Sequence, residues 1–244
     1  MGYASDSSLH AHHAIQVCVA ADGPFRLRKG TSGEWASYDI GIIPSDFEHA
    51  LDGGEARVAL LYVDPETAEG RQLAIVYGEL CRPALTADCI ALLRSRIADD
   101  RAAEATLGDA ASLRDAILGA MLPPTAPRRR IDARVALVLD RLRNTAAGAV
   151  CATDLAAGVS LSVGRFAHLF RDNTGVPVRR YLLWLRLVEA LRLMASATSL
   201  TEVAHGAGFA DSAHLTRTFR RMFGLAPSAL HRSSSFVRIP DTKL

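Results

Sequence analysis

The feature that most constrains the fold of this chain is a repeat in its second half. Residues 154–175 and residues 202–224 resemble each other, and their best-matched positions are separated by a constant 49 residues. These positions are Phe166 and Leu215, Phe170 and Phe219, and Gly175 and Gly224. Each copy has the pattern of a short helix, a tight turn and a second helix that begins at a polar cap, Ser162 or Asp211. The repeat therefore predicts an all-α region built from two helix-turn-helix units.

The half that carries the repeat is strongly basic. Residues 128–244 hold 18 basic and 8 acidic side chains, a net charge of +10, and 17 of the 18 are arginines. Residues 1–127 hold 10 basic and 18 acidic side chains, a net charge of −8. Arginine suits contacts with phosphates and base edges. An acidic first half joined to a basic second half indicates a sensor attached to a nucleic-acid binder.

A proline-rich segment separates the two halves. Three of the five residues from 123 to 127 are prolines, which cannot continue a helix. We expect a linker at 123–130. This linker separates the front part of the chain from a helical domain at 131–235. The front part consists of a β-domain at 1–85 and a two-helix element at 86–122.

The front part predicts an α+β arrangement. Residues 9–78 contain short β-prone runs separated by turn signals, which favours a small β-barrel or sandwich. From Thr86 to Met121 the apolar residues follow a helical period, which predicts two amphipathic helices with Thr86 as the first cap. The face that includes Leu93 is expected to remain apolar and to bind a second subunit.

Residues 131–232 resemble the DNA-binding domain of the AraC/XylS family of bacterial transcription regulators, most specifically over 203–227. The resemblance extends more loosely to the front half, because many members carry a cupin-like barrel and a two-helix dimerisation element. It implies two helix-turn-helix units, and an apolar stripe of helical period at 178–195 predicts the long helix that joins them. Their second helices would read successive major grooves of double-stranded promoter DNA, with a dimer of subunits and RNA polymerase as partners.

Helical periodicity selects the residues that face the DNA. With Phe166, Phe170 and Leu215 directed inward, the outward positions of the two second helices become candidates. Arg165 and Arg217 are expected to read bases, and the arginines further along each helix to clamp phosphates. The candidates are Arg165, His168, Arg171, Ser212, His214, Thr216, Arg217, Arg220 and Arg221. The first unit departs from the family pattern at Gly164 and Ala167, which predicts fewer base contacts there.

Histidines in the acidic half form a second candidate site. The patterns His10-x-His12-x₃-Gln16 and Pro44-x₄-His49 resemble two cupin motifs, with Gln16 where Glu is usual and Asp46 where Gly is usual. Three imidazoles and an amide oxygen could hold a divalent ion such as Ni, Fe, Mn or Zn. The same four side chains could instead line a pocket for an organic effector. A third interpretation places His10 to His13 on the surface of a frayed N-terminus.

The remaining features indicate the compartment. The chain has no apolar run of 18 residues and no signal-peptide pattern at its start, so we expect a cytoplasmic protein without a membrane span. Four cysteines are expected to be reduced thiols. A redox-sensing pair of Cys81 and Cys89 is an alternative input.

Two functions of different classes compete. The first is a sequence-specific transcription regulator whose promoter binding is controlled by an effector of unknown identity in the front domain. The second is a cupin-type metalloenzyme with an appended helical domain. No organised general acid or base accompanies the histidines. The enzyme hypothesis also does not explain the repeat or the positive charge of the second half. The sequence therefore favours a regulator that is not an enzyme.

Overall fold

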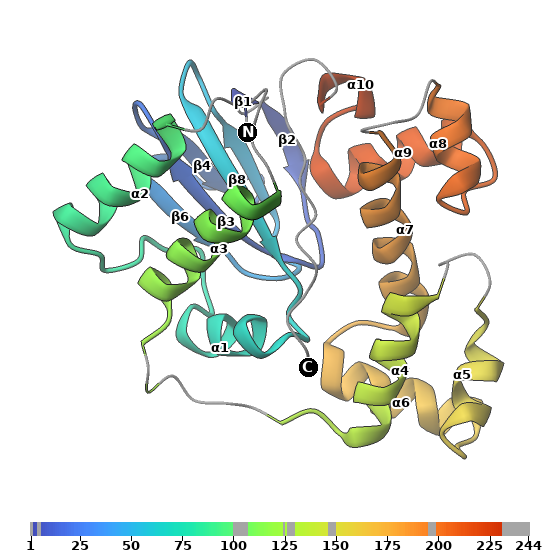
Figure 1. Ribbon diagram of the computed structural model, residues 1–244. Helices are drawn as coiled ribbons and strands as arrows, with labels where there is room; N and C mark the ends of the chain where they lie inside the picture. The colour runs from blue at the N-terminus through green and yellow to red at the C-terminus, as the bar shows by residue number, and fades with distance from the viewer. Residues whose placement is uncertain are drawn as a thin grey trace. The chain divides into compact units, whose positions relative to one another are not determined.

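The computed structural model describes residues 2–3, 6–99, 107–123, 125, 130–145, 150–194 and 199–230 (Figure 1). The chain divides into two compact units, of which one holds residues 1–128 and 218–243 and the other holds residues 129–217 and 244. Most of the predicted linker at 123–130 lies outside the described residues, so its conformation stays a prediction. No helix in the described ranges has both the length and the apolar character needed to cross a membrane.

The first unit contains two antiparallel β-sheets. Among the described residues, one sheet has the strand order β1-β8-β3-β6 and the other β2-β7-β4-β5. The strands are β1 (Gly2–Tyr3), β2 (Ser7–His10), β3 (Ile15–Ala20), β4 (Phe25–Lys29), β5 (Trp35–Tyr38), β6 (Ile40–Ile43), β7 (His49–Asp52) and β8 (Arg57–Val63). The prediction of a β-rich front domain is confirmed.

The predicted barrel is not closed. In the described part of the chain the two sheets share no ladder, and each ends in edge strands, β1 and β6 in one and β2 and β5 in the other. Their inner faces pack on each other instead, because Cys18 and Ala20 of β3 lie in one apolar cluster with Phe25 and Leu27 of β4. Strands this short bury their apolar faces as a sandwich, without the continuous staggered ladder that closure requires.

Strand β3 is buried on both faces, and its residues alternate between two cores. Gln16, Cys18 and Ala20 face the second sheet, whereas Ile15, Val17 and Val19 pack against helices. The helices on that outer side are α1 (Ala68–Val76), α2 (Ala87–Asp99) and α3 (Leu107–Met121) (Figure 1). The two helices expected between Thr86 and Met121 are therefore present, and Thr86 Oγ1 accepts a hydrogen bond from Cys89 N at 3.3 Å.

Two expectations for the first unit are wrong. Residues 68–76, expected within the strand region, form α1, because Thr67 caps the helix by accepting from Gly70 N at 3.0 Å. Leu93, expected on a dimer face, is 1% exposed and belongs to the core between α2 and β3. The large apolar side chain that α2 leaves in solvent is its neighbour Leu92, at 54% exposed.

The second half of the chain is helical throughout its described residues, as predicted. Its helices are α4 (Ala133–Asn144), α5 (Ala152–Gly158), α6 (Val163–Thr174), α7 (Val178–Met194), α8 (Leu200–Gly206), α9 (Ser212–Phe223) and α10 (Pro227–Leu230). Phe166, Phe170 and Tyr181 centre an apolar core that joins α4, α5, α6 and α7. The 17-residue helix α7 corresponds to the long connecting helix that the sequence predicts.

Candidate nucleic-acid interface and histidine cluster

Helices α5 and α6 form the first copy of the repeat. The turn between them places Ser160 in the left-handed region at φ 56°, and Ser162 then caps α6 by accepting from Arg165 N. Gly175 ends α6 at φ 78°, where its N–H donates to the Arg171 carbonyl. Leu155 and Ala156 of α5 are buried together with Phe166. The turn and both caps thus come from local sequence.

Helices α8 and α9 form the second copy. Gly208 turns the chain at φ 79°, a conformation that glycine adopts without strain. Asp211 caps α9, since its Oδ1 accepts from His214 N at 2.6 Å, and this hydrogen bond is the largest cause that lowers the pKa of Asp211. Gly224 follows α9 at φ 69° and corresponds to Gly175. The two polar caps and the paired glycines agree with the sequence expectation.

The matched positions have matched burial. Phe166, Phe170, Leu215 and Phe219 are all at most 1% exposed. Ala156 and Ala204, small residues in the first helix of each copy, are 1% and 0% exposed. The first helices of the two copies, α5 and α8, begin 48 residues apart, whereas α6 and α9 begin 49 apart. The second turn is therefore one residue longer, and Gly208 lies in this longer turn.

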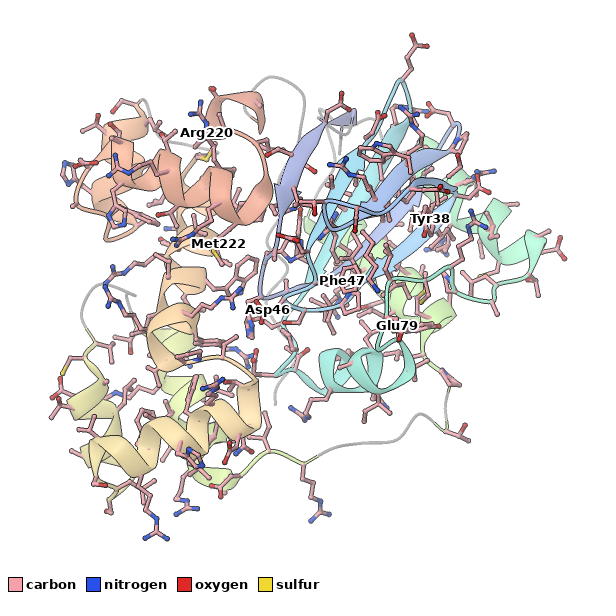
Figure 2. The ribbon with its side chains drawn as sticks, turned by 180° about the vertical axis from the view of Figure 1, so that it is seen from behind. Tyr38, Asp46, Phe47, Glu79, Arg220 and Met222 are labelled. Carbon is pink, nitrogen blue, oxygen red and sulfur yellow. The ribbon has the colours of Figure 1, made fainter. Side chains whose placement is uncertain are left out.

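The candidate DNA-binding side chains lie outward on α6 and α9. On α6, Arg165, His168 and Arg171 are exposed. On α9 the three arginines, Arg217, Arg220 and Arg221, are exposed. The smaller candidates, Ser212, His214 and Thr216, are half-buried. Figure 2 labels exposed Arg220 and buried Met222 on this helix. No residue of α9 is acidic, so the charged side chains on its outward face are all arginines.

Two half-buried candidates on α9 are held in place. The ring of His214 meets the edge of Phe209 at 5.2 Å between centroids, and Thr216 Oγ1 donates to the Ser212 carbonyl at 2.8 Å. On α6 the His168 ring lies 3.7 Å from the Asp172 carboxylate, and both are exposed. A hollow of about 460 Å³ lies beside this helix. Its lining includes Gly164, Ala167, His168, Arg171 and Arg179.

The histidine cluster lies where the two sheets of the first unit meet. His10 ends β2 and pairs in register with His49 at the start of β7, His12 lies in the loop before β3, and Gln16 is on β3. The ring centroids of His10 and His49 are 4.2 Å apart, and His12 lies 5.6 Å from His10 and 5.2 Å from His49. The structure brings these four side chains together, and His12 Nε2 is 2.7 Å from Gln16 Oε1.

Burial keeps these imidazoles neutral. Burial, helped by the neighbouring His12, lowers the pKa of His10 to about 4. Burial, together with His10 and His12, lowers the pKa of His49 to about 2. Burial lowers the pKa of His12 as well, although its contact with Gln16 opposes the shift. The surface interpretation is therefore wrong, since His10, His12 and His13 are 6%, 1% and 0% exposed.

His13 belongs to a separate charged group that the sequence did not suggest. Its Nε2 lies 2.8 Å from Glu66 Oε1, and its Nδ1 lies 3.6 Å from Asp46 Oδ2. Burial opposes the charge on His13, but the hydrogen bonds and charges of Asp46 and Glu66 together raise its pKa to about 9. Figure 2 labels Asp46 and Phe47 in the loop between β6 and β7. Asp46 has φ 58°, which explains why glycine is usual at this position of the cupin motif.

The cysteines occupy unlike surroundings. All four are free, and Cys81 and Cys89 are half-buried in the core beneath α2. Cys18 is fully buried and accepts a hydrogen bond from Gln16 Nε2 at 3.2 Å. Burial raises the pKa of the Cys18 thiol to about 12, so it stays protonated at neutral pH.

Comparison with known proteins agrees with this geometry. Residues 155–233 match a helix-turn-helix domain family. Over 105 residues the chain is 38% identical to the transcriptional activator RhaS of Pectobacterium carotovorum, a match that covers 43% of this chain and 37% of that protein. RhaS of Pectobacterium atrosepticum is 41% identical over 85 residues, which are 34% of this chain and 30% of that protein. The chain thus spans about a third of the length of the curated relatives it matches.

The whole fold also has a solved counterpart. ToxT of Vibrio cholerae aligns with a TM-score of 0.58 over 93% of this chain and 91% of its own, at 13% identity. A β-sheet domain followed by a helical domain is therefore an arrangement that this chain shares with a known structure. Residues 155–233 are thus similar to a helix-turn-helix domain, and the second half of the chain is similar to part of a transcriptional activator.

Proposed function

We propose that the whole chain is a sequence-specific transcription regulator that binds double-stranded promoter DNA through α6 and α9. The observation that carries the proposal is the duplicated helix pair, in which each second helix has a buried aromatic or leucine face and an exposed arginine face. The family match at 155–233 supports this function over the metalloenzyme alternative. In the proposal α5–α6 and α8–α9 each act as a helix-turn-helix unit.

The connecting helix has a length that suits two grooves. Its 17 residues extend about 26 Å at 1.5 Å per residue. With the width of the flanking helices, this length approaches the roughly 34 Å that separates successive major grooves on one face of B-DNA. We therefore assign α6 and α9 to neighbouring major grooves.

The exposed side chains divide into two proposed roles. Arg165 and Arg217 lie in the first half of α6 and α9, and we assign them to base edges, where arginine binds guanine O6 and N7. His168, Ser212, His214 and Thr216 add contacts in the groove. Arg171, Arg220 and Arg221 lie further along their helices, and we assign them to phosphates.

The sheet unit is the proposed control element. A structure of ToxT, which shares this fold, is described as bound to an unsaturated fatty acid. By that likeness we assign the effector-binding role to the sheet unit, at the cluster of His10, His12, Gln16 and His49. A second copy of the chain, bound through α2 and α3, and RNA polymerase complete the proposed partners.

Selection from a random DNA pool tests this function with the full chain. We expect enrichment of one sequence, and footprints at two sites about 10 base pairs apart. We expect affinity to fall steeply with salt, because arginines displace counterions from phosphates. A pool that yields no enriched sequence, together with binding that does not respond to salt, would refute the proposal.

A further inference from the structure

The three clustered histidines are fixed in one tautomer by the backbone. His10 Nδ1 lies 2.8 Å from the Ser8 carbonyl, His12 Nδ1 lies 2.9 Å from the Ala14 carbonyl, and His49 Nδ1 lies 2.9 Å from the Phe47 carbonyl. A carbonyl oxygen only accepts hydrogen bonds, so each Nδ1 must carry the proton and donate it. Each neutral ring therefore keeps its lone pair on Nε2.

The ring nitrogens of the three histidines lie close together in one small cluster. The three histidines each offer a ring nitrogen, and these nitrogens lie within 4.8 Å of one another. His49 is 0% exposed, and its Nε2 is buried without a hydrogen-bond partner. A buried acceptor with no donor costs free energy, which a ligand at this position would recover.

Gln16 adds an amide to the cluster. Its side chain lies between His12 and Cys18, with Oε1 2.7 Å from His12 Nε2 and Nε2 3.2 Å from Cys18 Sγ. An amide oxygen this close to His12 Nε2 can share a ligand with it.

We propose that His10, His12 and His49 bind one divalent transition-metal ion through their Nε2 atoms, with Gln16 Oε1 as the fourth ligand. This ligand set is that of a zinc-type tetrahedral site, in which nitrogen and oxygen ligands lie about 2.0–2.2 Å from the ion. Ligands at that distance lie about 3.4 Å from one another. When the ion binds, the histidine nitrogens therefore draw together, whereas His12 Nε2 and Gln16 Oε1, which are 2.7 Å apart, separate slightly. The backbone carbonyls of Ser8, Ala14 and Phe47 supply the outer hydrogen bonds that orient the rings.

The donor set selects the class of ion. Imidazole favours Zn²⁺, Ni²⁺, Co²⁺ and Cu²⁺, whereas Mg²⁺ and Ca²⁺ require mostly oxygen ligands. Cys18 stays outside the set, since its Sγ contacts the Gln16 amide at 3.2 Å and does not converge with the three histidine nitrogens. All four ligands are neutral, so they do not compensate the charge of the ion. Replacement of Gln16 by a carboxylate should therefore tighten binding.

Metal titration of the full chain tests the site directly. The protein is freed of any affinity tag, treated with EDTA, dialysed, and titrated with Co²⁺ by absorption and with Zn²⁺ by calorimetry. We expect one ion per chain and the visible bands of four-coordinate Co²⁺. His49→Ala and His10→Ala should each weaken Zn²⁺ binding at least about tenfold. His205→Ala, which removes an exposed histidine of α8, should leave it unchanged.

A second variant separates a metal site from a merely structural cluster. Gln16→Glu should tighten Zn²⁺ binding about tenfold or more, because it adds a negatively charged ligand. Thermal unfolding in EDTA shows whether each variant remains folded, and added Zn²⁺ should raise the Tm of the wild type but not of His49→Ala. A folded wild type that binds no ion with stoichiometry near one, or a Gln16→Glu variant with unchanged affinity, would overturn the site.

The role of the ion as effector rests on the proposed function. Measurements of DNA binding distinguish a failure of the metal site from a failure of the proposed function. The selected duplex is titrated with the EDTA-treated chain, with and without Zn²⁺. A change in DNA affinity that His49→Ala abolishes supports the ion as effector. Metal binding with unchanged DNA affinity leaves the site standing and removes its regulatory role. DNA binding by a chain that takes up no metal removes the site and leaves the proposed function standing.

Discussion

His12 and His13 are adjacent in the sequence but carry opposite protonation states at neutral pH. Burial lowers the pKa of His12, whereas Asp46 and Glu66 overcome burial and raise the pKa of His13 to about 9. His12 is directed into the histidine cluster, and His13 toward the loop that carries Glu66. The buried positive charge of His13 depends on its carboxylate partners.

Removal of Glu66 should therefore destabilise the sheet unit. Glu66 is 1% exposed, and its Oε1 accepts from His13 Nε2 at 2.8 Å. We expect Glu66→Ala to lower the free energy of unfolding by about 3–5 kcal/mol, because it leaves a buried charge without its closest partner. Glu79→Ala, at an exposed carboxylate, should change it by less than about 0.5 kcal/mol. Urea unfolding at pH 7 measures both, and equal losses would show that the pair is not important for stability.

The sequence predicted one of these two histidine sites and not the other. His10, His12 and Gln16 were found because their spacing matches a known motif, and His49 because it lies five residues after Pro44. His13 and Glu66 are 53 residues apart and share no local pattern, so only the packed structure joins them. The left-handed backbone of Asp46 was equally hidden, because aspartate is not the residue that usually marks such a position.

At the scale of elements, periodicity predicted the long segments and missed a short one. Helices α6, α7 and α9 have caps or apolar stripes that specify them locally. Helix α1 has nine residues and a glycine in its first turn, which weakens its helical signal. Gly70 is needed there because a Cβ would lie 2.0 Å from the Asp64 carbonyl oxygen. A tertiary contact thus overrides the local preference.

Neighbouring leucines on α2 test the proposed dimer. Leu92 is 54% exposed and Leu93 is 1% exposed. If α2 contributes to the subunit interface, Leu92→Glu should shift the chain toward monomer with little change in the Tm. Leu93→Glu should instead lower the Tm sharply, because it buries a charge in the core of its own chain. Sedimentation velocity and thermal unfolding distinguish these results. An unchanged dimer in a folded Leu92→Glu variant would place the interface elsewhere.

Gly164 on α6 gives a third test. A Cβ added there meets no atom within 4 Å, and the position is exposed inside the helix. Gly164→Ala should therefore raise the free energy of unfolding by about 0.5–1 kcal/mol through helix propensity. Chemical unfolding checks this effect, for which Gly175→Ala is the contrasting variant. Gly175 has φ 78°, so alanine there should destabilise α6. A destabilised Gly164→Ala variant would contradict the open surroundings of this position.

At the scale of the whole molecule, the charge division and the repeat are consistent with the same function. The basic half contains the helix pairs, and the acidic half contains the sheets and the buried histidines. The helical class of the second half could be predicted because a duplicated pattern constrains two segments at once. The choice between a closed barrel and an open sandwich could not, because closure depends on ladder pairing between strands and not on the β-propensity of each strand.

Two arginines of α9 distinguish the reading of bases from general attraction to DNA. Arg217 lies in the first half of α9 and Arg221 near its end, and both are exposed. If Arg217 binds a guanine, Arg217→Ala should cost about 1–3 kcal/mol on the selected duplex and relax the preference at one base pair. Arg221→Ala should weaken binding to all duplexes alike and reduce the salt slope by about one, as expected for a lost phosphate contact.

The measurement is a titration of each full-length variant against selected and scrambled duplexes at several salt concentrations. Arg192→Ala is the matched control, because this α7 arginine is paired with Glu189 at 2.6 Å and is not assigned to DNA. It should leave affinity and salt slope near those of the wild type. If Arg217→Ala and Arg221→Ala lose affinity equally on both duplexes, Arg217 is a phosphate contact. The base-reading role then passes to Arg165, Ser212 or His214.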